Sequence, residues 1–128
     1  AIGNGNIVYL TDTIVVMLFT AAPDIDSDTF ISDLTGEITG GGYVRKTLAS
    51  KTITTDDANN RTIFDAADVQ WTGLTNAFRY IVVAKSTGVD ATSRCLLSID
   101  LGSTQTLVAG TYDITWPVSG VFNISNVV

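Results

Sequence analysis

Short segments rich in β-branched residues, separated by turn signals, recur along most of the chain and constrain its fold more than any other feature. After residue 42 there are nine such segments, at residues 43–49, 51–55, 62–65, 69–72, 78–85, 94–101, 105–108, 112–116 and 121–124. Between them stand residues typical of turns, such as Thr87-Gly88 and Ala109-Gly110. Short strands separated by frequent turns predict an all-β fold, mainly an antiparallel β-sandwich or a barrel-like sheet.

Two further segments precede this series. The run from Thr13 to Thr20 is β-branched and nearly all apolar, which is typical of a strand buried on both faces. Residues 26–35 predict one short helix, because Asp26 or Ser27 can act as its N-cap and apolar side chains recur at helical spacing. The glycine triplet at residues 40–42 follows as a hinge or a tight turn.

The chain has the length of one domain. Its 128 residues are enough to bury roughly two-thirds of the unfolded surface, so neither a disulfide nor a metal is needed for stability. We expect residues 1–12 to form an N-terminal arm and residues 13–128 to form a single β-sandwich domain. No signal peptide is visible, and the longest apolar stretch, Ile14–Phe19, is short beside the ~20 residues that cross a bilayer. We therefore expect a soluble protein without membrane contact.

The charge balance restricts the partners that we expect. Acidic residues outnumber basic ones by 13 to 7, and the net charge is −6, which disfavours nucleic acid as a partner. Only 16% of the residues are charged, against about 25% in an ordinary soluble domain. Two interpretations remain open: other subunits cover part of the surface, or threonine and serine coat the outer faces of the sheets.

Side chains suited to acid–base and metal chemistry are scarce. There is no histidine, and Cys95 lies in an apolar run, so we expect a buried, inert thiol. Four aspartates could form a paired-carboxylate site of the glycosidase kind: Asp65, Asp68, Asp100 and Asp113. Each stands at a strand edge or in a turn, where aspartate is common for local hydrogen bonding. The sequence therefore predicts no catalytic residue.

Two other features suggest ligand binding. The alternating residues Asp24, Asp26 and Asp28 resemble part of a calcium loop, but the glycine and glutamate of an EF-hand loop are missing, which favours helix capping. Trp71 and Trp116 could serve as platforms for a sugar, although their apolar strand setting favours packing in the core. We predict no metal site and no cofactor.

Several short motifs follow one another in a fixed order between residues 13 and 124. The first half contains VMLF at residues 16–19 and SDLTGEITGGGY at 32–43. The second half contains DAADVQW at 65–71, AFRYIVV at 77–83, SIDLG at 98–102, YDITW at 112–116 and GVFNI at 120–124. In this order the motifs resemble a family of small virion structural proteins of tailed bacteriophages and prophages.

The resemblance implies a non-enzymatic virion structural protein, and in particular a capsid decoration (cement) protein that binds and stabilises the assembled shell. Its expected partner is the major capsid protein or another virion protein, with self-association, for which a trimer is a natural arrangement. Residues 1–12 are one expected contact element. The expected location is the virion, after synthesis in the cytoplasm of the host bacterium. The alternatives are a neck, tail or fibre subunit and a carbohydrate-binding adhesin domain.

Overall fold

The computed structural model describes residues 8–24, 27–118 and 120–125, which form two antiparallel sheets. The main sheet has the strand order β2-β1-β5-β6, with β1 at Ile14–Phe19, β2 at Lys46–Thr47, β5 at Val69–Lys85 and β6 at Cys95–Ile114. The side sheet has the order β3-β4-β7, with β3 at Thr52–Asp56, β4 at Arg61–Asp65 and β7 at Phe122–Ser125. The predicted all-β, antiparallel class is confirmed.

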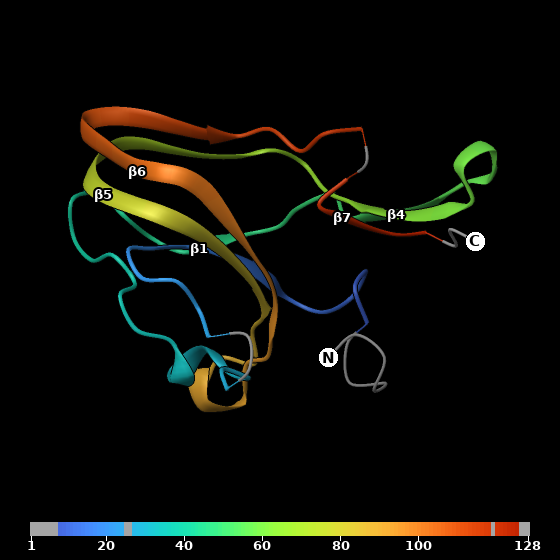
Figure 1. The fold of residues 1–128 in the computed structure, drawn as a ribbon, viewed down its shortest axis with the longest axis horizontal. Coiled ribbons are helices and arrows are strands. Elements are labelled where there is room, and N and C mark those ends of the chain that lie inside the picture. The colour runs from blue at the N-terminus through green and yellow to red at the C-terminus, as the bar shows by residue number, and fades with distance from the viewer. Residues whose placement is uncertain (1–7, 25–26, 119, 126–128) are drawn as a thin grey trace.

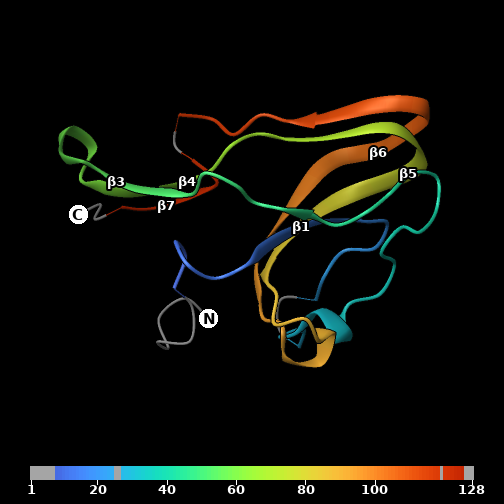
Figure 2. The same cartoon turned by 180° about the vertical axis from the view of Figure 1, so that it is seen from behind.

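The long hairpin of β5 and β6 gives the molecule its shape. Figure 1 shows this hairpin arching around β1, and Figure 2 shows the same curve from behind. The side sheet extends away from one end of the main sheet instead of lying face to face upon it. The larger hydrophobic cluster includes Trp71, Leu74 and Phe78 from the bend of β5. The curvature of one hairpin therefore encloses much of the core.

Five of the expected strands are joined into two long ones. The expected strands 69–72 and 78–85 are parts of β5, and those at 94–101, 105–108 and 112–116 are largely contained in β6. Gly73 and Gly102 lie inside these strands with φ values of +62° and +85°. The register between β5 and β6 shifts on both sides of Leu74. The glycines that predicted turns therefore lie at bulges, where β5 and β6 bend but remain paired with each other.

Strand β1 is buried on both faces, as predicted. All six of its residues are buried. Alternate residues enter two hydrophobic clusters: Ile14, Val16 and Leu18 belong to the larger, and Val15, Met17 and Phe19 to the smaller. Strand β5 pairs with all six residues on one side; on the other, β2 pairs with Val15 and Val16, and the Leu18 N–H donates to the Tyr43 hydroxyl. An apolar strand in this position needs no polar face.

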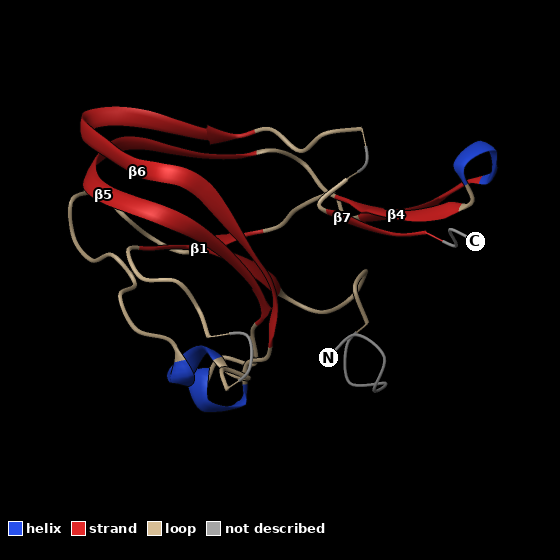
Figure 3. Ribbon diagram, in the orientation of Figure 1, coloured by secondary structure: helices blue, strands red, loops and turns tan. Residues whose placement is uncertain are grey.

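The short helix predicted at residues 26–35 is present only as a single 3₁₀ turn in the described part of this segment. The turn, η2, lies at Ile31–Asp33, and Asp26 lies outside the described residues. The Ile31 N–H donates to the Ser93 carbonyl, and the Cys95 N–H donates to the Thr29 carbonyl. Because these backbone groups pair with another segment, tertiary contacts override the local helical spacing. Two more 3₁₀ turns, η3 at Asp57–Asn59 and η4 at Asp90–Thr92, complete the helical content of the described residues (Figure 3).

The glycine triplet forms a tight turn that docks against the bend of β5. The Thr75 N–H donates to the Gly41 carbonyl at 2.8 Å, and the Asn76 side-chain amide donates to the Gly40 carbonyl at 2.8 Å. All three glycines have positive φ. Of the two sequence-based alternatives, hinge or tight turn, the structure selects the turn.

Candidate functional site

Tyr9 fixes the side sheet to the rest of the molecule. Its ring lies edge-on to Phe64 of β4 and Phe122 of β7, with centroids 5.4 and 5.7 Å away. Its hydroxyl donates to the Asp65 carbonyl at 2.8 Å, and the side chain is 5% exposed. Part of the segment expected to be an arm therefore belongs to the core, while residues 1–7 lie outside the described residues.

Two lysines and one aspartate hold the chain just after Tyr9. The Lys51 ammonium donates to the Asp12 carbonyl, and the Lys85 ammonium lies 3.2 Å from the Asp12 carboxylate. The Val8 N–H also donates to that carboxylate, and this bond, with help from Lys85, keeps the Asp12 pKa below its usual range. Removing residues 1–10 would thus take a buried ring out of the core, so we expect this deletion to destabilise the fold as well as to remove a contact element.

Burial of Tyr9 has a consequence at high pH. Burial, with the nearby charge of Asp65, raises the pKa of Tyr9 to about 12 from the ordinary value of 10.0. Between these values the unfolded chain has lost the proton and the folded chain keeps it, so the free energy of unfolding falls as pH rises. We expect Tyr9→Phe to weaken this alkaline loss in urea unfolding at neutral and alkaline pH. Burial also raises the pKa values of Tyr43 and Tyr112, but both remain in the variant, so an unchanged slope would speak against Tyr9.

The outer edge of the main sheet is formed by β6. Among the described residues only the start of this strand is covered on that side, where the Cys95 N–H donates to the Thr29 carbonyl. From Leu101 to Tyr112 the strand contains no charged residue and no proline, the residues that commonly protect a sheet edge. Val108, in this stretch, is 81% exposed. Such an edge can add an extended segment from another chain through backbone hydrogen bonds.

Each of the four aspartates considered for a paired-carboxylate site accepts a hydrogen bond, from a sequence neighbour for Asp65 and from a residue at least 21 positions away for the other three. The donors are the Ala66 N–H for Asp65, the Trp116 N–H for Asp68, Arg79 for Asp100 and the Gln70 amide for Asp113. The hydrogen bonds from Arg79 and from the Gly102 N–H hold the pKa of Asp100 below its usual range. Within the described ranges, no group of three or more His, Cys, Asp or Glu side chains is placed to hold a metal ion. These aspartates therefore have structural partners.

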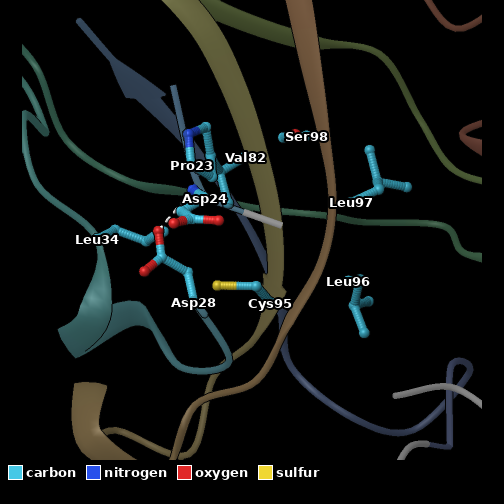
Figure 4. Close-up of a pocket in the computed structure, with 9 residues that line it drawn as sticks. All are labelled: Pro23, Asp24, Asp28, Leu34, Val82, Cys95, Leu96, Leu97 and Ser98. Carbon is cyan, nitrogen blue, oxygen red and sulfur yellow. Dashed lines mark hydrogen bonds between the residues drawn. The ribbon is translucent and has the colours of Figure 1, made fainter. Parts of the chain in front are cut away.

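Asp24 and Asp28, two of the three residues of the calcium hypothesis, border a pocket of about 200 Å³ (Figure 4). They belong to a local turn, because the Asp24 N–H donates to the Asp28 carboxylate and the Asp28 N–H donates to the Asp24 carbonyl, both at 2.8 Å. Cys95 lies beside them and is half-buried, less enclosed than we expected. Burial, with two nearby aspartates, raises its pKa to about 11, so the thiol stays protonated near neutral pH.

The two tryptophans differ in exposure. Trp71 is 1% exposed and its indole N–H donates to the Val44 carbonyl at 2.7 Å, which confirms its predicted place in the core. Trp116 is half-buried and its indole N–H donates to the Ala67 carbonyl at 3.1 Å. The buried Trp71 ring offers no face to a sugar, so the adhesin hypothesis loses one of its two platforms.

Sequence reasoning missed an ionic network around Arg45. Its guanidinium contacts the Glu37 carboxylate at 2.7 Å and the Asp90 carboxylate at 2.8 Å, and the Tyr43 hydroxyl also donates to Glu37. The network ties the segment before β2 to the 3₁₀ turn η4. Asp90 is far from Arg45 in sequence, so no local spacing could have indicated this contact.

Comparisons of the chain with protein-family models, with curated proteins and with solved structures gave no match. In the ranges that the structure describes, no helix has the length and apolar character needed to cross a membrane.

Proposed function

We propose that this chain is a structural protein of a phage virion, and specifically a capsid decoration protein that binds and stabilises the assembled shell. The observation that carries the proposal is the long edge of β6, which is uncharged from Leu101 to Tyr112 and lies along the rim of the main sheet. The ordered motifs that resemble phage virion proteins support it. Three of these motifs lie in strands of the main sheet: VMLF in β1, AFRYIVV in β5 and SIDLG in β6.

The chemistry of such an edge suits a protein that covers a lattice. An extended segment of the major capsid protein, added beside β6, would pair with the backbone N–H and C=O groups of that strand. Such pairing requires few specific side chains. A protein that binds the assembled shell better than the free subunits stabilises the shell by mass action. Many such contacts over one particle reinforce one another when the copies are also linked to each other.

The role is tested by the content of particles made by cells that encode this chain. Quantitative mass spectrometry of purified particles should find the chain at a copy number comparable to that of the major capsid protein, and cryo-electron microscopy should place it on the outer shell. A copy number far below that of the capsid protein would assign it to the neck, tail or fibres. Its absence from the particles would overturn the virion role.

The contact edge is tested by a charge placed on it. Val108→Lys should lower binding of the purified protein to undecorated shells about tenfold, equivalent to about 1.4 kcal/mol, because the ammonium must be desolvated beside the added strand. Val118→Lys is the matched control, since Val118 is 89% exposed and lies outside the strand. Equal binding by the two variants in a co-sedimentation assay would exclude this stretch of β6 as the contact.

A further inference from the structure

The side sheet has an exposed edge of its own at β3. This strand is one of the two edge strands of the sheet, and Figure 2 shows it on the rim of the part that extends away from the main sheet. The side chains of Thr52, Ile53, Thr54 and Thr55 are all exposed. Its β-branched sequence favours an extended strand, and from Thr52 to Thr55 it carries neither a charge nor a proline to prevent pairing.

The hydrogen bonds of β4 show which way the backbone groups of β3 point. The Val121 N–H, from the residue just before β7, donates to the Phe64 carbonyl at 2.8 Å, and Phe64 pairs with Phe122, so Phe64 directs its backbone groups toward β7. Alternate residues of a strand direct their N–H and C=O groups to opposite sides. Ile63, next to Phe64, therefore directs its backbone groups toward β3, and Asp65 lies on the same side, with a carbonyl that also accepts the Tyr9 hydroxyl.

The register of the hairpin extends this result to β3. Thr54 stands opposite Ile63, and Thr52 stands opposite Asp65. These threonines therefore use their backbone groups inside the side sheet. The residues that alternate with them, Ile53 and Thr55, direct their N–H and C=O groups outward from the sheet.

This geometry limits the registers in which β3 can pair with its own copy, and the overlap of the two strands favours one of them. In an antiparallel pair, residues that exchange hydrogen bonds must both point toward the partner. Ile53 of one copy can face Thr55 of the other, which places a two-fold axis at Thr54; the alternatives, Ile53 facing Ile53 or Thr55 facing Thr55, overlap fewer residues of the strand. This register aligns all five residues of β3 and supplies about four backbone hydrogen bonds, two at each Ile53–Thr55 contact.

The charges that flank β3 fit the same register. Lys51 precedes the strand and Asp57 follows it, so a two-fold axis at Thr54 sets Lys51 of each copy opposite Asp57 of the other. The Asp57 side chain is exposed and makes no hydrogen bond or ion pair within the described part of the chain. Lys51 gives one N–H to the Asp12 carbonyl and keeps others for a second acceptor. A parallel pairing would instead place like charges together.

We propose that β3 binds β3 of a second copy of this chain in antiparallel fashion, with the two-fold axis at Thr54. The two side sheets then form one continuous six-stranded sheet in the order β7-β4-β3-β3-β4-β7. The partner is a second copy because the edge complements itself, in its outward groups and in its flanking charges. The pairing does not depend on the virion role proposed above.

A cysteine at the two-fold axis tests the register. In the proposed dimer Thr54 faces its own copy as a non-hydrogen-bonded pair, with Cα atoms about 4.5 Å apart, a separation that a disulfide can bridge. In a full-length Cys95→Ser background, Thr54→Cys should form a covalent dimer under mild oxidation. Thr52→Cys is the matched control, because it lies on the same face of the same strand but about 13 Å from its own copy. Equal cross-linking of the two variants, or cross-linking of Thr54→Cys only to a different protein, would overturn the proposal.

Exchange of the flanking charges tests the identity of the partner. Lys51→Glu and Asp57→Lys should each weaken the homodimer about tenfold, because each sets like charges together at both ends of β3. An equimolar mixture of the two variants should form heterodimers in which both ends again carry opposite charges. Native mass spectrometry should show this preference, with circular dichroism confirming that both variants fold. A random mixture of homodimers and heterodimers, or a wild-type protein that stays monomeric at high concentration, would refute β3 self-pairing.

Discussion

Replacing Gly41 by alanine should lower the free energy of unfolding by about 3–5 kcal/mol, from overpacking together with backbone strain. Gly41 has a φ of +59°, and a Cβ atom at this position would lie 2.0 Å from the Thr75 carbonyl oxygen. That oxygen belongs to the bend of β5, and the Thr75 N–H also donates to the Gly41 carbonyl. The turn and the bend would have to separate, so the substitution strains the backbone and breaks the dock at once.

Gly40→Ala is the control for this prediction. Gly40 also has a positive φ, of +66°, but a Cβ there would meet nothing within 4 Å. We expect a loss of about 1 kcal/mol, the cost of the left-handed conformation alone. Urea unfolding followed by tryptophan fluorescence measures both variants. If the two losses are equal, the close approach of Gly41 to the bend contributes nothing and only backbone conformation matters.

The strands that depend on local pattern could be predicted from the sequence. The run at residues 13–20 was placed within one residue of β1 at each end, because an unbroken β-branched apolar segment leaves few alternatives. Strands β3 and β4 were also predicted to within one residue, at residues 51–55 and 62–65, since residues typical of turns at 57–60 separate them. In both cases the sequence pattern and the strand that it predicts occupy the same short segment of the chain.

The errors arose where distant contacts decide the structure. Gly73 and Gly102 predict turns when only the neighbouring residues are considered. Each instead lies at a bend within a strand, because the partner strand continues beside it. The helix at 26–35 was predicted from apolar spacing, but pairing of Ile31 with Ser93 limits the helical structure there to one 3₁₀ turn. Ser93 is 62 residues from Ile31, and the strand partners nearest the two glycines, in the pairs Leu74–Gly110 and Tyr80–Asp100, are 36 and 20 residues apart, so no local pattern records these contacts.

The candidate interaction surfaces were only partly visible in the sequence. The uncharged stretch from Leu101 to Tyr112 can be seen in the sequence, but it becomes an edge only through the strand order, which places β6 last. In the same way, Lys51 and Asp57 indicate an interaction surface only once the strand between them is known to direct backbone groups outward from the sheet. Low overall charge suggested covered surfaces, and the topology supplies two places where a partner strand could be added.

Tyr9→Ala should lower the free energy of unfolding by about 3–5 kcal/mol, the usual loss when a buried aromatic ring is removed from a core. The loss of stability should be larger in the side sheet than in the main sheet, because the ring joins Phe64 and Phe122 of the side sheet to the larger cluster. Hydrogen exchange should therefore rise more in β4 and β7 than in β1 and β5. Equal changes in both sheets would mean that Tyr9 stabilises the molecule as a whole and does not anchor the side sheet.

Two matched variants separate the contributions of this residue. Tyr9→Phe keeps the ring but leaves the Asp65 carbonyl without the hydroxyl donor, and should lower the free energy of unfolding by about 1–2 kcal/mol. Leu10→Ala alters the next side chain, which is half exposed, and should change stability by less than about 1 kcal/mol. Because the backbone directions of β3 depend on an ordered side sheet, Tyr9→Ala should also weaken the pairing of β3 with its copy, while Leu10→Ala leaves that pairing intact. A dimer unaffected by Tyr9→Ala would show that β3 keeps its edge without the anchor.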